Sequence, residues 1–213
     1  MGLAERTPAN EIQRVGNSIF LPSAGGDKRV QIESTDIEDV KVITPKKLGD
    51  HRGFFSEVYV KRIFDEAGLA LNFVQDNHSF SAEVGTIRGL HFQSPPFAQD
   101  KLVRVTRGRV LDVAVDLRRS SKTFGRHVAV ELSAENWRQL LVPIGFAHGF
   151  CTLEPNTEVL YKVTNVYAPA NDLGLAFDDP ALGIDWGFDL AKAKLSDKDR
   201  RHPRLADLPA IFY

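Results

Sequence analysis

The segments 85-GTIRGLHFQ-93 and 143-PIGFAHGF-150 each place a histidine in a short apolar stretch next to glycine. In the first segment Arg88 and His91 fall on a predicted strand, and in the second a Pro-x-Gly turn leads to His148. Polar side chains inside sheet strands cost free energy unless they find partners. The two histidines therefore indicate a polar pocket built into a sheet.

The chain around these segments alternates short β-like stretches with turn signals. The predicted strands cover residues 40–44, 54–60, 73–75, 86–92, 101–107, 110–117, 127–132, 139–142, 149–153 and 158–163. Many short strands with few helices are typical of an antiparallel sandwich or barrel, so we expect an all-β fold. One short helix is expected at residues 62–67, ended by Gly68, and the charged tail from Leu195 is expected to be helical or irregular.

Local signals give three further expectations. Residues 1–35 read as an N-terminal extension with at most one short strand, near residues 29–32, ahead of a single domain at 36–213. The stretches on either side of Arg107-Gly108 resemble a tight hairpin. Residues 169–180, bounded by prolines, read as a long surface loop.

Composition narrows the classes of function. Lys and Arg total 27 against 28 Asp and Glu, a net charge of −1, which removes the electrostatic case for nucleic acid or an anionic membrane surface as partner. The single cysteine, Cys151, forms no intramolecular disulfide, and the N-terminus lacks the apolar core of a secretory signal, so we expect a cytoplasmic protein. Dinucleotide, P-loop and serine-esterase motifs are all missing from the sequence.

The two histidine segments resemble the two motifs of the cupin jelly roll, in which histidines on neighbouring strands face one pocket. Metal-binding cupins carry His-x-His and a later Glu in the first motif. Here Gln93 stands in place of the second histidine, and no Glu follows until Glu131. The ligand set for a divalent metal is incomplete, so we expect no metal cofactor.

Two more polar residues fall within predicted strands. Lys101 opens one strand, and Asp112 interrupts the apolar run LDVAV of the next. Asp112 is expected either to support a site or to satisfy a buried partner such as His148. Two histidines, a lysine and a carboxylate favour a functional pocket over a plain core.

Seven motifs, in order, resemble the dTDP-4-dehydrorhamnose 3,5-epimerase family of the cupin superfamily, over about residues 37–212. They are DHRGFFSE (50–57), FVQDNHS (73–79), RGLHFQ (88–93), KLVRV (101–105), SAENWRQLLVPIGFAHGF (133–150), YKVTNVYAP (161–169) and LSDKD (195–199). The resemblance implies an isomerase that needs no cofactor. Its substrate would be dTDP-4-dehydro-6-deoxy-D-glucose, inverted at C3 and C5.

The resemblance also implies a role for each matching residue. His91 matches the base, Asp199 its carboxylate partner, Tyr161 the acid that returns a proton to the opposite face, and Lys101 a group near the enolate. Tyr167 matches the aromatic ring that stacks on thymine. The other substrate-binding positions are Arg52, Glu57, Gln75, Asn77, Arg88, His148, Asp172 and Lys198. The family implies a homodimer in which the partner's residues 52–57 and 75–77 help to complete each site.

Some positions depart from the family pattern and leave rivals open. Asp172 stands where a glutamate is expected, and Ala176-Phe177 replaces an Arg-Trp pair. A mono-epimerase acting at C3 or C5 alone is therefore the nearest alternative. A sugar-binding cupin without catalysis and a metal-dependent cupin oxygenase are the others. His51 and His202, flanked by charged residues, are expected to be exposed.

Overall fold

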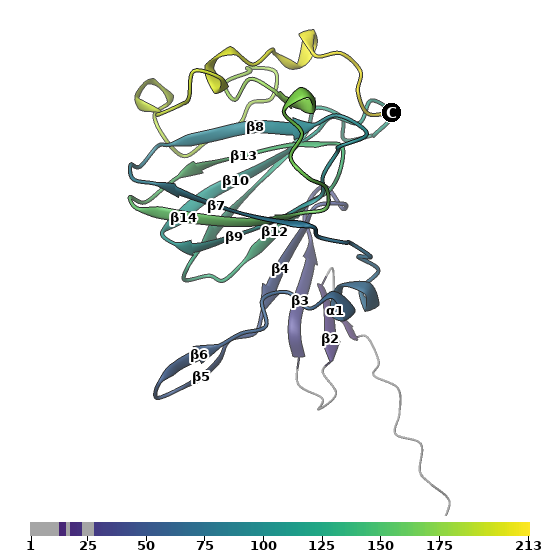
Figure 1. The fold of residues 1–213 in the computed structure, drawn as a ribbon, viewed down its shortest axis with the longest axis vertical. Helices are drawn as coiled ribbons and strands as arrows, with labels where there is room; N and C mark the ends of the chain where they lie inside the picture. Colours follow the sequence, from purple (N-terminus) through teal and green to yellow (C-terminus); the bar gives the residue numbers. More distant parts are fainter. Residues whose placement is uncertain (1–12, 16–17, 23–27) are drawn as a thin grey trace, which may run out of the picture.

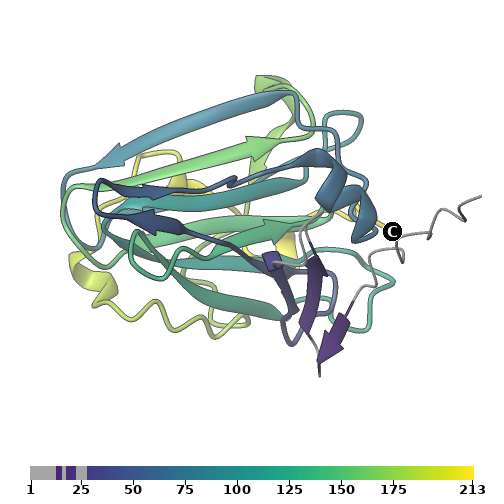
Figure 2. The ribbon, with the colours of Figure 1, turned by 90° about the horizontal axis from the view of Figure 1, so that it is seen from below.

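The computed structural model describes residues 13–15, 18–22 and 28–213, and its main body is two antiparallel sheets packed face to face (Figures 1 and 2). The larger sheet contains, in spatial order, β1 (Gln13–Val15), β2 (Ser18–Pro22), β3 (Lys28–Ser34), β4 (Lys41–Pro45), β12 (Gln139–Val142), β9 (Lys101–Arg107), β14 (Thr157–Val163) and β7 (Gln75–Ser81). The smaller contains β11 (His127–Ser133), β10 (Arg109–Asp116), β13 (Phe146–Thr152), β8 (Ile87–Gln93) and β15 (Asp172–Gly174). The predicted all-β jelly roll is confirmed.

Helices are few and short. Among the described residues the one α-helix is α1 (Lys61–Glu66), close to its predicted position, and the 3-10 turns are η1 (Pro169–Asn171), η2 (Leu190–Lys192), η3 (Asp199–Arg201) and η4 (Leu205–Asp207). A separate hairpin of β5 (Leu48–Asp50) and β6 (Gly53–Phe55) projects away from the two sheets (Figure 1). No helix within the described residues is long and apolar enough to cross a membrane.

Three apolar clusters hold these layers together. The space between the sheets is filled from both sides, for example by Val103 and Leu140 of the larger sheet and Phe150 of the smaller. The outer face of the smaller sheet is covered by the C-terminal segment, whose buried apolar residues include Trp186 and Phe212. A third cluster joins the outer face of the larger sheet to α1. Both sheets therefore bury both faces in part.

The expected hairpin at Arg107-Gly108 is wrong. Strand β9 pairs with β12 and β14 in the larger sheet, whereas β10 pairs with β11 and β13 in the smaller. Gly108, at φ +74°, turns the chain from one sheet to the other. A short glycine turn is compatible with either a hairpin or a crossover between sheets. The strands with which each flanking segment pairs decide between the two.

Two other local expectations are corrected. The N-terminal extension contains three strands among its described residues rather than at most one, because β1, β2 and β3 extend the larger sheet through the β3–β4 pairing. Residues 169–180 are not a surface loop throughout, since β15 pairs with β8 and Leu175 is fully buried. Of the strands expected at 54–60 and 73–75, the first ends at Phe55 and the second begins at Gln75. Pairing with distant strands decides the outcome for β15 and β7, whereas β1, β2, β3 and β6 pair with their neighbours in sequence.

The C-terminal cluster predicts that Trp186→Ala lowers the free energy of unfolding by about 3–5 kcal/mol. The Trp186 side chain is only 1% exposed, and its indole N–H donates to the Phe177 carbonyl at 2.9 Å. Chemical denaturation measures the change, with Tyr213→Ala, at a residue 86% exposed, as the matched control. A loss below about 1 kcal/mol would mean that the C-terminal segment is not part of the cooperative core.

Candidate active site

Two adjoining cavities, of about 240 and 220 Å³, open between the sheets. They share His91, Lys101 and Tyr161 as lining residues. The first is also lined by Ser79, Arg88, His148, Phe150, Ser196, Lys198 and Asp199, and the second by Gln75, Asn77, Phe92, Gln93, Gln99, Tyr167 and Asp172. Of the fourteen site residues expected from the sequence, all except Arg52, Glu57 and Asp112 line one or both cavities.

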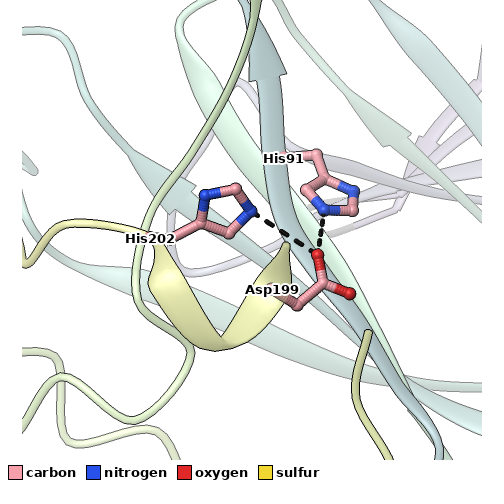
Figure 3. A group of neighbouring side chains, drawn as sticks. All are labelled: His91, Asp199 and His202. Carbon is pink, nitrogen blue, oxygen red and sulfur yellow. Dashed lines mark hydrogen bonds and ion pairs between the residues drawn. The ribbon is translucent and has the colours of Figure 1, made fainter. Parts of the chain in front are cut away.

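His91 on β8 meets Asp199 at the start of η3 (Figure 3). His91 Nε2 lies 2.5 Å from Asp199 Oδ1, and the carboxylate is nearly buried. Burial favours the neutral acid, but the rings of His202 and His91 and the Ser196 hydroxyl outweigh it and hold the pKa of Asp199 well below its usual range. Asp199 is therefore a buried anion that faces the histidine, as expected from the sequence.

His202 was expected to be exposed, and this expectation is wrong. Its side chain is 8% exposed, and its Nε2 lies 3.5 Å from the same Asp199 oxygen (Figure 3). The ring also meets His91 edge to face, with centroids 5.4 Å apart at 80°. The charged neighbours in the sequence predicted that His202 faces solvent, but the turn η3 directs its side chain inward. The spacing of three residues from Asp199 was the one signal that could have placed both on one side of a turn.

Tyr161 approaches from the opposite sheet. It lies on β14, between Asn77 of β7 and Val103 of β9. Burial raises the pKa of its phenol, the positive charge of Arg88 lowers it, and the negative charge of Asp172 raises it. The hydroxyl therefore stays protonated throughout the neutral range. The cavity has a histidine on one wall and a protonated tyrosine on the other.

Lys101 crosses from the larger sheet toward the smaller. Its ammonium donates to the His91 carbonyl at 3.3 Å, and the side chain is buried on a central strand. Burial lowers the pKa of Lys101 to about 8, although the carboxylates of Asp172 and Asp112 act in the other direction. The group is a buried cation that can lose its proton just above neutral pH.

His148, which lines the first cavity, forms a buried pair with Asp112. His148 Nε2 lies 2.8 Å from Asp112 Oδ1, which confirms the partner expected for Asp112. His148 on β13 is also the register partner of His91 on β8. Asp112 Oδ2 is buried without a hydrogen bond. The contact with Asp112 therefore fixes the orientation of the His148 ring.

Polar residues at the cavity mouth are tied to one another. The Tyr167 hydroxyl donates to Asp172 Oδ2 at 2.9 Å, and the Lys198 ammonium contacts the same oxygen at 2.5 Å. The Gln75 amide donates to Asn77 Oδ1 at 2.8 Å. These residues come from β7, β14–β15 and the tail, yet they meet at one opening. Arg88, on β8, donates to Ser81 Oγ and the Phe80 carbonyl.

Arg52 and Glu57 do not reach this cavity within the chain. Arg52 lies in the turn of the β5–β6 hairpin, 78% exposed, and pairs with Asp50. Glu57 follows the same hairpin. The hairpin also exposes the large apolar side chains of Leu48, Phe54 and Phe55.

The Gln93 side chain is not available as a metal ligand, because its amide is hydrogen-bonded to the backbone. Its amide nitrogen donates to the carbonyls of Phe97 and Val166, and its oxygen accepts from the Ala168 N–H. The one ligand-like group found among the described residues is His91, Asp199 and His202. Two ligand atoms on a tetrahedral zinc stand about 3.3 Å apart. The 2.5 Å between His91 and Asp199 is instead a direct hydrogen bond.

Comparison with known proteins places this arrangement in context. The family model for dTDP-4-dehydrorhamnose 3,5-epimerase matches residues 34–207. A relative from Sinorhizobium fredii with that name is 52% identical over 180 residues, covering 84% of this chain and 92% of the relative.

The solved structures that are similar in fold include two epimerases with bound sugar nucleotides. The dTDP-6-deoxy-D-glucose-3,5-epimerase of Legionella pneumophila, solved with dTDP-4-keto-L-rhamnose, has a TM-score of 0.81 and 44% identity over 85% of this chain and 95% of its own. A 3'-monoepimerase of Streptomyces bikiniensis, solved with dTDP-quinovose, has a TM-score of 0.76 and 33% identity over 81% and 87%. With a family model matching most of its length and a relative more than half identical, the chain belongs to the dTDP-4-dehydrorhamnose 3,5-epimerase family of cupin isomerases.

Proposed function

We propose that the protein inverts C3 and C5 of dTDP-4-dehydro-6-deoxy-D-glucose, with His91 as base and Tyr161 as acid. The observation that carries this proposal is that the two side chains face one cavity from opposite sheets. Inversion of a carbon centre requires removal of a proton from one face and delivery to the other. A single group, or two on one wall, would return the proton where it was taken.

The first step is removal of a proton from the carbon beside the 4-keto group. The His91 tautomer that donates Nε2–H to Asp199 leaves Nδ1 as the basic nitrogen. Proton transfer makes His91 a cation next to a buried carboxylate, which stabilises it. The electron pair of the broken C–H bond moves onto the keto oxygen and gives an enolate.

Lys101 supplies the positive charge for that enolate oxygen. A full charge in a buried site stabilises developing negative charge more strongly than it would in water. The ammonium is held close to the base because it donates a hydrogen bond to the backbone carbonyl of His91 itself.

Tyr161 completes the inversion by giving its hydroxyl proton to the carbon from the opposite face. Solvent then reprotonates the tyrosinate, and His91 loses its proton to solvent, so the site is reset for the second carbon. This chemistry moves protons only, so we propose that no redox group, metal or other cofactor takes part.

Binding of the nucleotide diphosphate needs cations and a ring to stack on. Arg88 and Lys198 line the first cavity, and their positive charges are suited to binding the diphosphate. Tyr167, half exposed at the mouth, offers a face for thymine. We propose that Arg52 and Glu57 act on the cavity of a second copy in a homodimer, since their own hairpin points away from the sheets (Figure 1). A reducing cytoplasm fits the lone buried Cys151.

Two rivals remain in view. A mono-epimerase would use the same base and acid but present one carbon only, and the Streptomyces bikiniensis structure has that name. The higher identity to relatives named 3,5-epimerases supports double inversion. A binding protein without catalysis would not need a buried base, its carboxylate and an opposed acid in one cavity.

Proton exchange in D₂O separates these alternatives. Wild-type protein, treated with a chelator, is expected to place deuterium at both C3 and C5 of the substrate, read by NMR. His91→Asn is expected to lose exchange at both carbons by about 10²–10⁴-fold while dTDP still binds. Tyr161→Phe is expected to exchange deuterium at C3 without inversion, because the base can still take and return a proton.

Tyr59→Phe, at a ring outside both cavities, is the matched control and should act as wild type. Deuterium at one carbon only would select the mono-epimerase. Loss of exchange on chelation, or substantial turnover by His91→Asn, would contradict the proposed mechanism.

Lys101 predicts the alkaline side of the pH profile. Its ammonium is present below its pKa of about 8 and is lost as the pH rises through that value, so kcat/KM should fall above pH 8. Lys101→Arg keeps the charge at all accessible pH values, so its profile should stay flat there, at a lower plateau. An unchanged alkaline limb in Lys101→Arg would assign the fall to another group.

Subunit complementation tests the homodimer. Arg52→Ala and His91→Asn homodimers should each be nearly inactive. If Arg52 serves the neighbouring cavity, a mixed dimer has one site with both residues intact, and random reassociation should recover about a quarter of wild-type activity. No recovery in mixed dimers verified by mass would show that Arg52 acts within its own chain or not at all.

A further inference from the structure

His202 is a buried titratable side chain next to the base, and none of the steps above uses it. His202 Nε2 is buried with no hydrogen-bond partner, 3.5 Å from Asp199 Oδ1. The same oxygen lies 2.5 Å from His91 Nε2, so both rings converge on one carboxylate atom (Figure 3). A buried donor left just short of a bond is costly unless it serves a purpose.

We propose that His202 is a positioning residue that shares the Asp199 oxygen with His91 and so limits how tightly the carboxylate holds the protonated base, an inference that rests on the proposed role of His91. The array is His91–Asp199–His202, with the carboxylate in the middle. His202 does not touch the cavity shared by the acid and base.

The fold reserves space for this ring. A Cβ built on Gly174 of β15 would stand 2.3 Å from the His202 Cε1 and Nε2 atoms. Only glycine at that position lets the ring lie flat against the β15 backbone and reach Asp199. Strand β15 pairs with β8 through Gly174 and His91, so the strand that carries the base also fixes the strand that seats His202.

The His91 ring bonds the Asp199 oxygen, and the polar edge of the His202 ring, 3.5 Å away, draws on the negative charge of the same atom. Protonated His91 is therefore held less tightly than by an unshared carboxylate, and it returns its proton more easily. The same sharing fixes the carboxylate from two directions, which holds His91 in the productive orientation. The charged or titratable groups that surround His202 are His91 from β8, Asp172 from β15, and Lys198, Asp199 and Arg201 from its own segment.

Lys198 and Asp172 are paired with each other, and the Arg201 guanidinium donates to the Asp197 carbonyl. Asp199 is thus the anion to which His202 is closest. Apolar packing alone would not require a ring nitrogen pointed at a carboxylate. The geometry favours an electrostatic role toward Asp199 over a purely space-filling one.

Three variants test this role. In His202→Leu the carboxylate is left to His91 alone, so the acidic limb of the kcat/KM profile should move to higher pH, by about half a unit. Its kcat should fall about tenfold, as the carboxylate loses one restraint. His202→Gln keeps a neutral donor and should restore most of both values. Gly174→Ala keeps the histidine but displaces its ring, and should behave like His202→Leu.

The NMR titration midpoint of the His91 ring gives a readout that does not depend on turnover. It should rise in His202→Leu and Gly174→Ala and stay near wild type in His202→Gln. His127→Leu, on the far strand of the smaller sheet, is the matched control. Thermal unfolding and circular dichroism verify that each variant is folded.

The outcomes are separable. If His202→Leu lowers only the melting temperature, with the pH profile and the His91 midpoint unchanged, His202 is a packing residue and the proposal is wrong. Stoichiometric Zn²⁺ binding that depends on His202 and is required for activity would also overturn it. If wild-type protein shows no deuterium exchange, the proposed function fails, yet the His91 midpoint in the variants still decides whether His202 positions Asp199.

Discussion

The hydrogen bond between His91 and Asp199 joins residues 108 positions apart, and most of the fold is needed to make it. Asp199 lies in a segment with little regular structure of its own. That segment is held because Trp186 and Phe212 bury themselves on the outer face of the smaller sheet. Apolar burial of the tail therefore sets the position of a charge, and the buried charge in turn has no stable alternative to facing the histidine.

The division of the chain between two sheets has a chemical consequence. At Gly108 the chain crosses from β9 to β10, so Lys101 and Asp112 belong to opposing walls although they are eleven positions apart in sequence. Strand β14 returns to the larger sheet and carries Tyr161 opposite His91. A flat hairpin would have put these groups on one surface. The sandwich is what gives the cavity two faces.

Sequence patterns predicted the class of fold and most of the residues that line the candidate site, for a physical reason. Strand periodicity and turn residues are local, and so are motifs such as RGLHFQ, which place His91 on a strand. Some pairing partners are not local, and this is why the hairpin at Gly108 and the loop at 169–180 were wrong. The strands of the extension do pair with their sequence neighbours, and they were missed because polar residues, glycines and prolines weaken the local strand signal there. The prediction that His202 is exposed was wrong because its burial depends on a contact that is not local. Its charged neighbours face solvent, but the His202 ring packs against Gly174 on a strand that lies elsewhere in the sequence.

Gln93 removes a potential metal ligand and at the same time holds a neighbouring loop in place. At the position where metal-binding cupins place a histidine, its amide binds the carbonyls of Phe97 and Val166 and the N–H of Ala168. Both hydrogens of the amide nitrogen and the amide oxygen are therefore used in hydrogen bonds with backbone atoms. Two of these residues, Val166 and Ala168, flank Tyr167, which lines the second cavity. A side chain whose amide is committed to the backbone of this loop is not free to coordinate an ion, so the contacts that exclude Gln93 as a ligand also shape the entrance of the cavity.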